Sequence, residues 1–268
     1  MTEASETPPP ARPSATILLL RGGEERLEVL MVERHHQIDF ATGASVFPGG
    51  KLEDLDRDER IRARTRGAET LADAALAYRV AGIRETFEES GILIAAEHGR
   101  DEPVGRARLQ EIEARHRNAL QAGQIGLADI LEAEELELLC DRFVHFAHWI
   151  TPLFMPKRFE THFYLVEAPP EQLARHDGSE SVDSAWLTID EALKQQRSGR
   201  RKIIFPTLAQ LEKLGRSSSV IEALETARRE PVVTVLPELG KDAEGRPRLI
   251  LPRDAGYPQS SVLLDNID

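Results

Sequence analysis

The sequence of 268 residues contains a single cysteine, Cys140. One cysteine forms no internal disulfide, so a secreted scaffold held together by disulfides is excluded and a reducing compartment is expected. No apolar run approaches the ~20 residues that span a membrane. The N-terminal stretch MTEASETPPPARPS carries acids and prolines and no apolar signal core. We therefore expect a cytoplasmic protein with no membrane partner.

An excess of basic residues is also missing from the chain. Lysine and arginine number 34 against 46 aspartates and glutamates, which gives a net charge of −12. Broad nucleic-acid binding usually needs a basic face, so a nucleic-acid partner is not expected, although a local basic pocket for phosphates is compatible with this charge. The 41% hydrophobic and 30% charged residues are ordinary for a globular chain that buries a substantial core.

The apolar pattern predicts a mixed α/β fold in one domain over residues 14–268, preceded by a disordered, Pro-rich tail at 1–13. Short apolar runs predict strands at 15–20, 27–32, 44–47 and 92–95, two more within 146–166, a further run at 184–187, and a hairpin within 232–251. Longer patterns predict helices at 71–90, 105–121, 128–142, 189–196, 207–214 and 219–229.

Two segments carry no chemistry that can be read from the residues. One is a helical insertion at about 102–143, which is compatible with a lid, a homodimer surface or a specificity insert. The other is a C-terminal extension at about 216–268. Cys140 lies in the Leu-rich part of the insertion, LELLCDRF, and is expected to be a small buried residue on a helix.

An acidic cluster near the end of the helix predicted at 71–90 is the most informative feature. Glu85 and Glu89 are four residues apart and Glu88 is three from Glu85, so their side chains share one face. The opposite face carries the apolar stripe of Leu76, Val80, Ile83 and Phe87. One side of the helix is therefore core, and the other is a dense patch of oxygen ligands.

Such a cluster is either a solvated surface or a metal site. Adjacent carboxylates repel one another, and negative charge is unfavourable at a helix C-terminus. Mg²⁺ prefers carboxylate oxygens and is commonly shared with substrate phosphates, so it would compensate both effects. Arg84 could orient one carboxylate, and the Gly49-Gly50 turn upstream lets backbone approach a ligand closely. We favour the metal site.

These residues resemble the box of the Nudix family, G-x5-E-x7-R-E-U-x-E-E-x-G-U, where U is apolar. The second half matches at Arg84, Glu85, Glu88, Glu89, Gly91 and Ile92. The first half matches at Gly50, with Asp56 in place of the first Glu. Thr86 stands where the family usually has an apolar residue. Residues 57–83, 27 in number, separate Asp56 from Arg84 where the family has seven, which implies an insertion inside the box.

A lengthened box is similar to the branch that includes the peroxisomal coenzyme A diphosphatase of animals and its bacterial relatives. The segments that resemble this branch are 44–50 (ASVFPGG), 149–152 (WITP), 158–163 (RFETHF), 186–187 and 205–208 (FPTL). The resemblance covers roughly residues 15–215 and implies a Nudix α/β/α sandwich with a mixed sheet.

The resemblance also implies roles for the acidic cluster. Glu85 and Glu89 would be the principal Mg²⁺ or Mn²⁺ ligands and Glu88 a third, while Arg84, Glu85 and Glu88 would belong to the catalytic array. Water would attack one phosphorus of a diphosphate. A general base is also needed, and Glu53, Glu180 and Asp183 are candidates, with Glu180 favoured.

Substrate contacts are expected from basic residues and from the Gly turn. Lys157 and Arg158 are candidates for phosphate binding, alongside Gly49 and Gly50; a charged strand end is the alternative for the two basic residues. None of the histidines has HExxH spacing, and we interpret them as structural. The histidines considered are His35, His36, His145, His148 and His162.

Three functions are compatible with these residues. The first is hydrolysis of coenzyme A or an acyl-CoA to a 4′-phosphopantetheine and adenosine 3′,5′-bisphosphate. The second keeps the reaction and takes ADP-ribose or another nucleoside diphosphate derivative. The third is a Nudix fold that binds a ligand without catalysis, which Thr86 and Asp56 hint at and the intact acidic cluster argues against.

Overall fold

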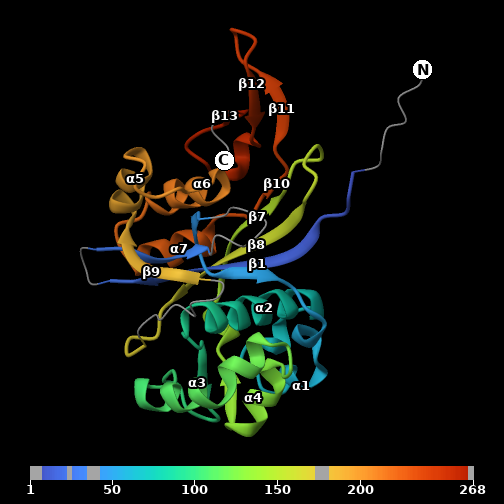
Figure 1. The fold of residues 1–268 in the computed structure, drawn as a ribbon, viewed down its shortest axis with the longest axis vertical. Helices are drawn as coiled ribbons and strands as arrows, with labels where there is room; N and C mark the ends of the chain where they lie inside the picture. Colours follow the sequence, from blue (N-terminus) through green and yellow to red (C-terminus); the bar gives the residue numbers. More distant parts are fainter. Residues whose placement is uncertain (1–7, 23–25, 35–42, 173–180, 265–268) are drawn as a thin grey trace.

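The computed structural model describes residues 8–22, 26–34, 43–172 and 181–264. At its centre lies an eight-stranded mixed sheet with the order β10-β7-β8-β1-β2-β3, in which β4 pairs with β1 and β9 with β2 (Figure 1). The strands are β1 (Arg12–Arg21), β2 (Glu28–Arg34), β3 (Ser45–Val46), β4 (Gly49–Lys51), β7 (Val144–Ile150), β8 (Phe159–Glu167), β9 (Ser181–Thr188) and β10 (Thr234–Val235).

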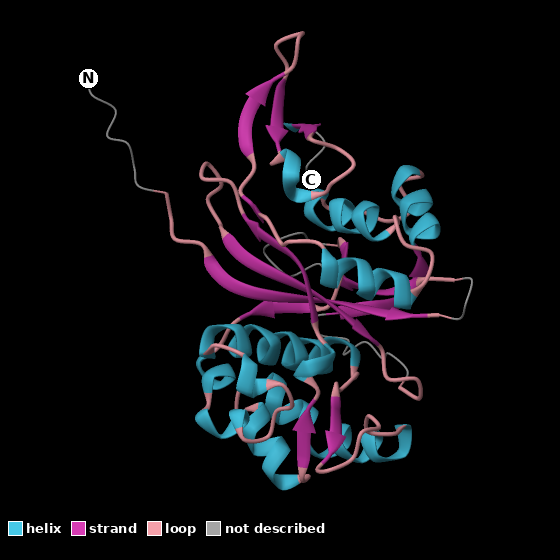
Figure 2. Cartoon of the chain, turned by 180° about the vertical axis from the view of Figure 1, so that it is seen from behind, coloured by secondary structure: helices cyan, strands magenta, loops and turns pink. Residues whose placement is uncertain are grey.

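Helices cover both faces of this sheet, so the chain forms an α/β/α sandwich (Figure 2). One face is covered by α5 (Ile189–Arg197), α6 (Phe205–Leu214) and α7 (Val220–Arg229). The other face is covered by α2 (Asp73–Ser90), which lies between the sheet and the group formed by α1 (Glu59–Arg62), α3 (Arg106–Gln121) and α4 (Leu127–Ala133). The predicted α/β/α sandwich with a mixed sheet is confirmed.

Strand β1 shows why the apolar run at its centre belongs inside the sheet. It runs parallel to β8 and antiparallel to β2 and β4. Ile17 and Leu19 pack into the hydrophobic cluster on the α2 side, while Leu18 and Leu20 pack into the cluster on the other side. Both faces of the strand are therefore buried, which explains a continuous rather than an alternating apolar run.

Most predicted elements are confirmed within a few residues, and α2 ends where the sequence predicts. Gly91 follows Ser90 with a φ of 73°, and its N–H donates to the carbonyl of Phe87. A left-handed residue at this position is the common helix C-cap, and glycine adopts it without strain. β1 begins at Arg12, so the last two residues of the predicted tail pair with β8 instead.

The predicted helix at 128–142 is wrong after residue 133. Helix α4 ends at Ala133, Glu135 has a φ of 53°, and the chain then enters β6 (Leu136–Leu138). β6 pairs with β5 (Ala95–Glu97), so the strand predicted at 92–95 lies later than expected. Leu136 and Leu138 are buried while Glu137 between them is not. This alternation favours a strand over the helix that the Leu and Glu content suggested.

Short turns and a small sheet complete the described chain. Cys140 is buried as predicted, but in the 3-10 turn η3 (Cys140–Arg142) rather than on a helix. The predicted C-terminal hairpin is confirmed as β11 (Glu238–Lys241) and β12 (Pro247–Ile250), joined by β13 (Ser261–Leu263). The other 3-10 turns are η1 (Asp54–Arg57), η2 (Ala68–Thr70) and η4 (Arg253–Ala255). In the described ranges, no helix has the length and apolarity needed to cross a bilayer.

Candidate active site

The acidic cluster of α2 is buried, although it consists of charged residues. Arg84, Glu85, Glu88 and Glu89 are each less than a tenth exposed. The reason is the position of α2, which is covered by the sheet on one side and by α3 on another (Figure 1). Burial of charge is unfavourable unless the groups are paired, hydrogen-bonded or bound to a metal. The cluster is therefore a buried network of charged groups and not a solvated helix face.

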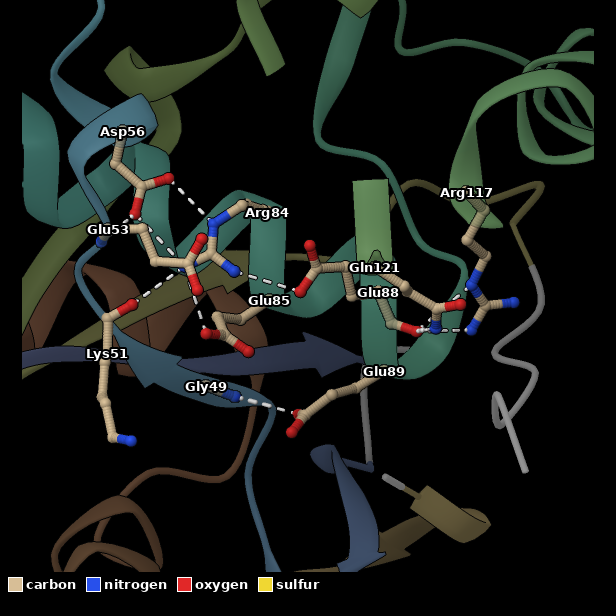
Figure 3. A network of polar contacts seen from close by, with 10 residues as sticks. All are labelled: Gly49, Lys51, Glu53, Asp56, Arg84, Glu85, Glu88, Glu89, Arg117 and Gln121. Atoms are coloured by element: carbon tan, nitrogen blue, oxygen red, sulfur yellow. Dashed lines mark hydrogen bonds and ion pairs between the residues drawn. The ribbon is translucent and has the colours of Figure 1, made fainter. Parts of the chain in front are cut away.

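Arg84 organises the acids through contacts from all sides of its guanidinium (Figure 3). Nε donates to Oδ1 of Asp56 at 2.9 Å and Nη2 to Oδ2 at 3.2 Å, a bidentate pair. Nη1 donates to Oε2 of Glu88 at 3.0 Å, and Nη2 also reaches the Lys51 carbonyl at 2.8 Å and Glu85 Oε1 at 3.1 Å. Burial alone would lower the pKa of Arg84, but these acids raise it above the ordinary value. Arg84 is permanently charged here.

The two halves of the box meet despite the 27 residues between them. Residues 57–83 fold as the end of η1, then α1 and η2, and finally the first eleven residues of α2, 73–83. The insertion thus lengthens the same helix that carries the acids. η1 brings Asp56 to Arg84, and its carboxylate also accepts a hydrogen bond from the Glu53 N–H at 2.8 Å. Asp56 is 3% exposed and occupies the place of the family's first Glu.

Gly49 and Gly50, which the sequence predicted as a turn, begin strand β4 instead and pack directly against the acids. The Gly49 N–H donates to Oε2 of Glu89 at 3.0 Å, which fixes one carboxylate to the backbone of β4. A Cβ atom at Gly50 would collide with the carboxylate of Glu85. A side chain at position 50 would force the Glu85 carboxylate to move, so glycine lets the carboxylate keep its observed place.

A contact that the sequence did not reveal holds the last turn of α2. The backbone carbonyl of Glu88 accepts hydrogen bonds from Nε and Nη2 of Arg117, at 3.2 and 2.8 Å, and from Nε2 of Gln121, at 2.9 Å. Arg117 also forms an ion pair with Glu113. The final carbonyls of a helix have no partner within it, so α3 satisfies one of them. Arg117 and Gln121 lie four residues apart on the predicted helix, but their partner cannot be read from that spacing.

The donor set fits a hard divalent cation. Glu85, Glu88 and Glu89 supply only carboxylate oxygens, which Mg²⁺ and Mn²⁺ prefer. In the structure these carboxylates contact Arg84 or Gly49, and Figure 3 shows all three along the same flank of α2. Gly50 packs closely against the Glu85 carboxylate on that flank. The buried charged residues of the box are Asp56, Arg84, Glu85, Glu88 and Glu89, and Arg84 is the one cation among them.

The predicted general bases are placed unevenly. Glu53 is exposed and lies beside Asp56 at the edge of the acidic cluster (Figure 3). Asp183 lies in β9, where its backbone pairs with Glu33. Glu180 lies outside the described residues, as do His35 and His36. Of the three candidates, Glu53 is therefore the one whose side chain the structure describes, and it lies at the edge of the cluster.

The two predicted phosphate ligands differ in their surroundings. Arg158 is buried and donates from Nε to the Thr151 carbonyl at 3.1 Å and from Nη1 to the Pro9 carbonyl at 2.7 Å. These contacts hold the residues before β1 against the start of β8. They correspond to the alternative that the sequence left open, a charged residue at a strand end. Lys157 is exposed. Of the two, Lys157 is the side chain that solvent, and hence a phosphate, can reach.

Three histidines gather on β7 and β8. The rings of His148 and His162 stack with centroids 4.1 Å apart, and Nε2 of His145 lies 3.0 Å from Nδ1 of His162. Burial lowers the pKa of His162 to about 3 and that of His145 to about 4, and the positive charge of Arg79 acts in the same direction. Both rings are therefore neutral at physiological pH.

Thr86 stands where the family pattern has an apolar residue, and its surroundings show that this change is conservative. The side chain is fully buried, and its Oγ1 has no hydrogen-bond partner among the described residues. Threonine has nearly the shape of valine, so it fills the apolar position of the box at the expense of one unsatisfied hydroxyl. The Thr86 carbonyl also accepts a hydrogen bond from the hydroxyl of the Ser90 side chain, with Oγ at 2.6 Å.

Comparison with known sequences gives one clear family. A profile described as the NUDT19 Nudix domain matches residues 58–214. The putative nudix hydrolase 7 of Caenorhabditis elegans is 26% identical over 205 residues, 76% of this chain and 60% of that protein. The acyl-coenzyme A diphosphatase NUDT19 of Xenopus laevis is 24% identical over 226 residues, 70% of this chain and 59% of that protein. The chain thus spans about three fifths of the length of these two relatives.

Comparison with solved structures agrees with the profile. A NUDIX hydrolase from Alicyclobacillus acidocaldarius superposes with a TM-score of 0.68 at 27% identity, over 81% of this chain and 96% of that one. The profile match begins at Asp58, after Gly50 and Asp56. The first half of the box therefore rests on the contacts described above, and the second half on both kinds of evidence.

Proposed function

Because the chain belongs to the Nudix hydrolase family, in the group described by the NUDT19 Nudix domain, we propose that it hydrolyses a diphosphate linkage with the help of Mg²⁺ or Mn²⁺. The observation that carries the proposal is the buried pair of Arg84 and Asp56. It closes the interrupted box, and Arg84 also contacts Glu85 and Glu88 on the same helix. A binding module without catalysis has no need for this costly arrangement.

The chain's own residues divide the work. Glu85 and Glu89 would hold the cation, with Glu88 as a third ligand. When bound, the cation supplies charge neutralisation at the phosphates and lowers the pKa of a nearby water. Arg84 keeps the carboxylates oriented, because it contacts Glu85 and Glu88 directly. The backbone N–H of Gly49 holds the Glu89 carboxylate in place.

The reaction then needs proton transfer and phosphate recognition. A base accepts a proton from water as its oxygen attacks one phosphorus, and the bond from that phosphorus to the bridging oxygen breaks. We assign the general base to Glu180. The alternative is Glu53, which lies at the edge of the cluster. Lys157 and Arg158 remain our candidates for phosphate contact, and the exposure of Lys157 makes it the first to test.

For the substrate we propose coenzyme A or an acyl-CoA. The support is the profile match and the relatives from Xenopus laevis and Gallus gallus, both named acyl-coenzyme A diphosphatase NUDT19 at 24% and 26% identity. The products would be a 4′-phosphopantetheine, acylated or free, and adenosine 3′,5′-bisphosphate. The alternative substrate is ADP-ribose or another nucleoside diphosphate derivative. The same acidic cluster would cleave it, and the residues that bind the groups on either side of the diphosphate would decide between the two substrates.

A substrate panel tests the proposal. Hydrolysis of CoA, acetyl-CoA, ADP-ribose, NADH and diadenosine polyphosphates is measured with Mg²⁺ or Mn²⁺ for the wild type, Glu89→Gln and Glu59→Gln. Glu59 is an exposed residue of α1 and serves as the matched control. We expect cleavage of CoA species, a loss of at least ~10²-fold in Glu89→Gln, which is typical when one group that stabilises transition-state charge is removed, and no change in Glu59→Gln.

The alternative outcomes separate the hypotheses. Cleavage of ADP-ribose but not of CoA species would keep the site and discard the substrate. Absence of cleavage by a folded, metal-loaded protein would refute the catalytic proposal and favour the ligand-binding function.

A further inference from the structure

A second cluster of metal-ligating side chains lies on β7 and β8. His148 pairs directly with His162 across these antiparallel strands. Glu160 precedes His162 by two residues, so it points to the same face of the sheet. One donor atom from each of the three side chains lies within 4.8 Å of the other two. Among the described residues, this is the one group of three or more His, Cys, Asp or Glu side chains that meets this distance condition.

The neighbours of both rings prepare them for coordination. Nδ1 of His148 is hydrogen-bonded to Oγ1 of Thr234 at 2.8 Å, and Nδ1 of His162 to Nε2 of His145 at 3.0 Å. Nε2 is therefore the nitrogen left for a ligand bond in each ring. Metal-binding histidines almost always have their other nitrogen held in this way, which fixes the ring and its tautomer. A threonine hydroxyl both donates and accepts, so it supports either tautomer of His148.

Glu160 completes the set and also opens it to solvent. Its Oε1 lies 3.1 Å from Nε2 of His148, and its side chain is 35% exposed, against 15% for His148. The rim at Glu160 therefore gives an ion an entry path, while the imidazoles lie deeper. Tyr78 of α2 covers His162 from the helix side, with ring centroids 4.2 Å apart.

This cluster is separate from the acidic cluster of α2. Ala15 of β1 pairs with His162 on one side and with Gly50 on the other. Two strand spacings, about 10 Å, therefore separate His162 from Gly50 of the box. Both clusters lie on the α2 side of the sheet, but no residue belongs to both.

We propose that His148, Glu160 and His162 form a second cation site for a borderline transition-metal ion of the Zn²⁺ class. Two imidazoles and one carboxylate suit Zn²⁺, whereas the oxygen-only set of Glu85, Glu88 and Glu89 suits Mg²⁺. Three protein ligands leave a fourth position toward the exposed side of Glu160. A bound ion would cross-link β7 to β8 next to β10, which contributes Thr234.

Zinc binding by the full chain tests the proposal. Protein stripped with a chelator is titrated with Zn²⁺ against a chromophoric indicator, with millimolar Mg²⁺ present to occupy the acidic cluster. The variants are Glu89→Gln, His162→Gln, Glu160→Gln and His98→Gln. His98 is the matched control because it is an exposed histidine paired with one glutamate, Glu137, without a third ligand.

We expect wild type, Glu89→Gln and His98→Gln to bind one Zn²⁺ with equal affinity. Loss of a ligand should weaken binding by more than the ~10- to 100-fold that loss of an outer partner causes, so His162→Gln and Glu160→Gln should fall at least ~100-fold. Glu160 is partly exposed, so its variant tests the site even if His162→Gln fails to fold. Unchanged binding in Glu160→Gln, or loss of binding in Glu89→Gln alone, would overturn the proposal.

Discussion

The acidic cluster of α2 and the histidine cluster of β7 and β8 lie on the same side of one sheet but are assembled differently. The acids come from one helix, and their spacing of three and four residues is visible in the sequence. The histidine cluster comes from two strands, where register brings His148 to His162. Helical spacing is local information, whereas strand register depends on the whole sheet. The first kind of site can be found from sequence and the second cannot.

The clusters also differ in what holds them. Arg84 and Asp56 tie the acids together through charge that is almost fully buried, at 4% and 1% side-chain exposure. The histidines are half-buried and held by stacking and by hydrogen bonds to Thr234 and to one another, and His145 and His162 are neutral. Loss of a buried charge is costly, whereas loss of a neutral neighbour is mild. We therefore expect mutations to separate the two clusters by size of effect.

The largest effect on stability is expected for Asp56→Asn. It removes the charge that compensates Arg84 in the interior, and breaking one side of a buried ion pair costs about 3–5 kcal/mol. Urea unfolding followed by circular dichroism measures this. Asp73→Asn is the control, because Asp73 also pairs with an arginine but its side chain is 98% exposed, and exposed pairs contribute little. Equal stability of the two variants would show that the buried pair is unimportant.

The next effect is expected for Arg117→Ala, which removes two of the three hydrogen bonds that described residues donate to the Glu88 carbonyl. Hydrogen bonds that involve a charged group contribute about 1.5–3 kcal/mol. The last turn of α2 should loosen, with lower unfolding free energy and weaker Mg²⁺ binding. Gln121→Ala, which removes the third bond, should lose only about 1 kcal/mol. An Arg117→Ala protein that matches the wild type in both measurements would contradict this role for α3.

A smaller effect should appear on the histidine side with Thr234→Val. The exchange removes the hydroxyl that holds Nδ1 of His148 and keeps the side-chain shape. Loss of such an outer partner weakens metal affinity by about 10-fold at the lower end of the usual range, and Thr234 is exposed. The zinc titration described above measures it. Diphosphatase activity should not change, and a parallel loss of activity would mean that the two clusters are coupled.

The smallest effect, and one of opposite sign, is expected for Thr86→Val. The exchange removes a buried hydroxyl without a described partner and keeps the branched shape, so the protein should gain about 1 kcal/mol of unfolding free energy. Thermal unfolding measures the gain. Thr86→Ser keeps the hydroxyl and loses a methyl group, so it should be less stable than the wild type. A destabilised Thr86→Val would reveal a partner for the hydroxyl.

The sequence was most informative where one element supplies the whole pattern. The stripe of Leu76, Val80, Ile83 and Phe87 predicted α2, and the acids on it were found from the same periodicity. The β6 strand was missed because Leu136 and Leu138 lie in a Leu- and Glu-rich stretch with high helix propensity. Tertiary pairing with β5 overrides that propensity.

Contacts between separate elements were not predicted from the sequence. Nothing in the spacing of Arg117 and Gln121 identifies the Glu88 carbonyl as their partner, because helix packing brings the groups together. HExxH is a helical pattern, in which residues four apart share a face. In a strand, residues two apart share a face, as Glu160 and His162 do. A two-residue spacing on a β-branched, aromatic segment was the signal available, and it becomes specific only when the neighbouring strand adds His148.

The contact between Asp56 and Arg84 also explains how a motif tolerates interruption. Seen as a polymer, the 27 residues between them form a loop whose ends are clamped together at 2.9 Å. The entropy of closing a loop grows only with the logarithm of its length, so lengthening it from seven to 27 residues costs about 1 kcal/mol. A change in the length of this loop therefore carries little entropic cost, provided that its two end residues stay paired.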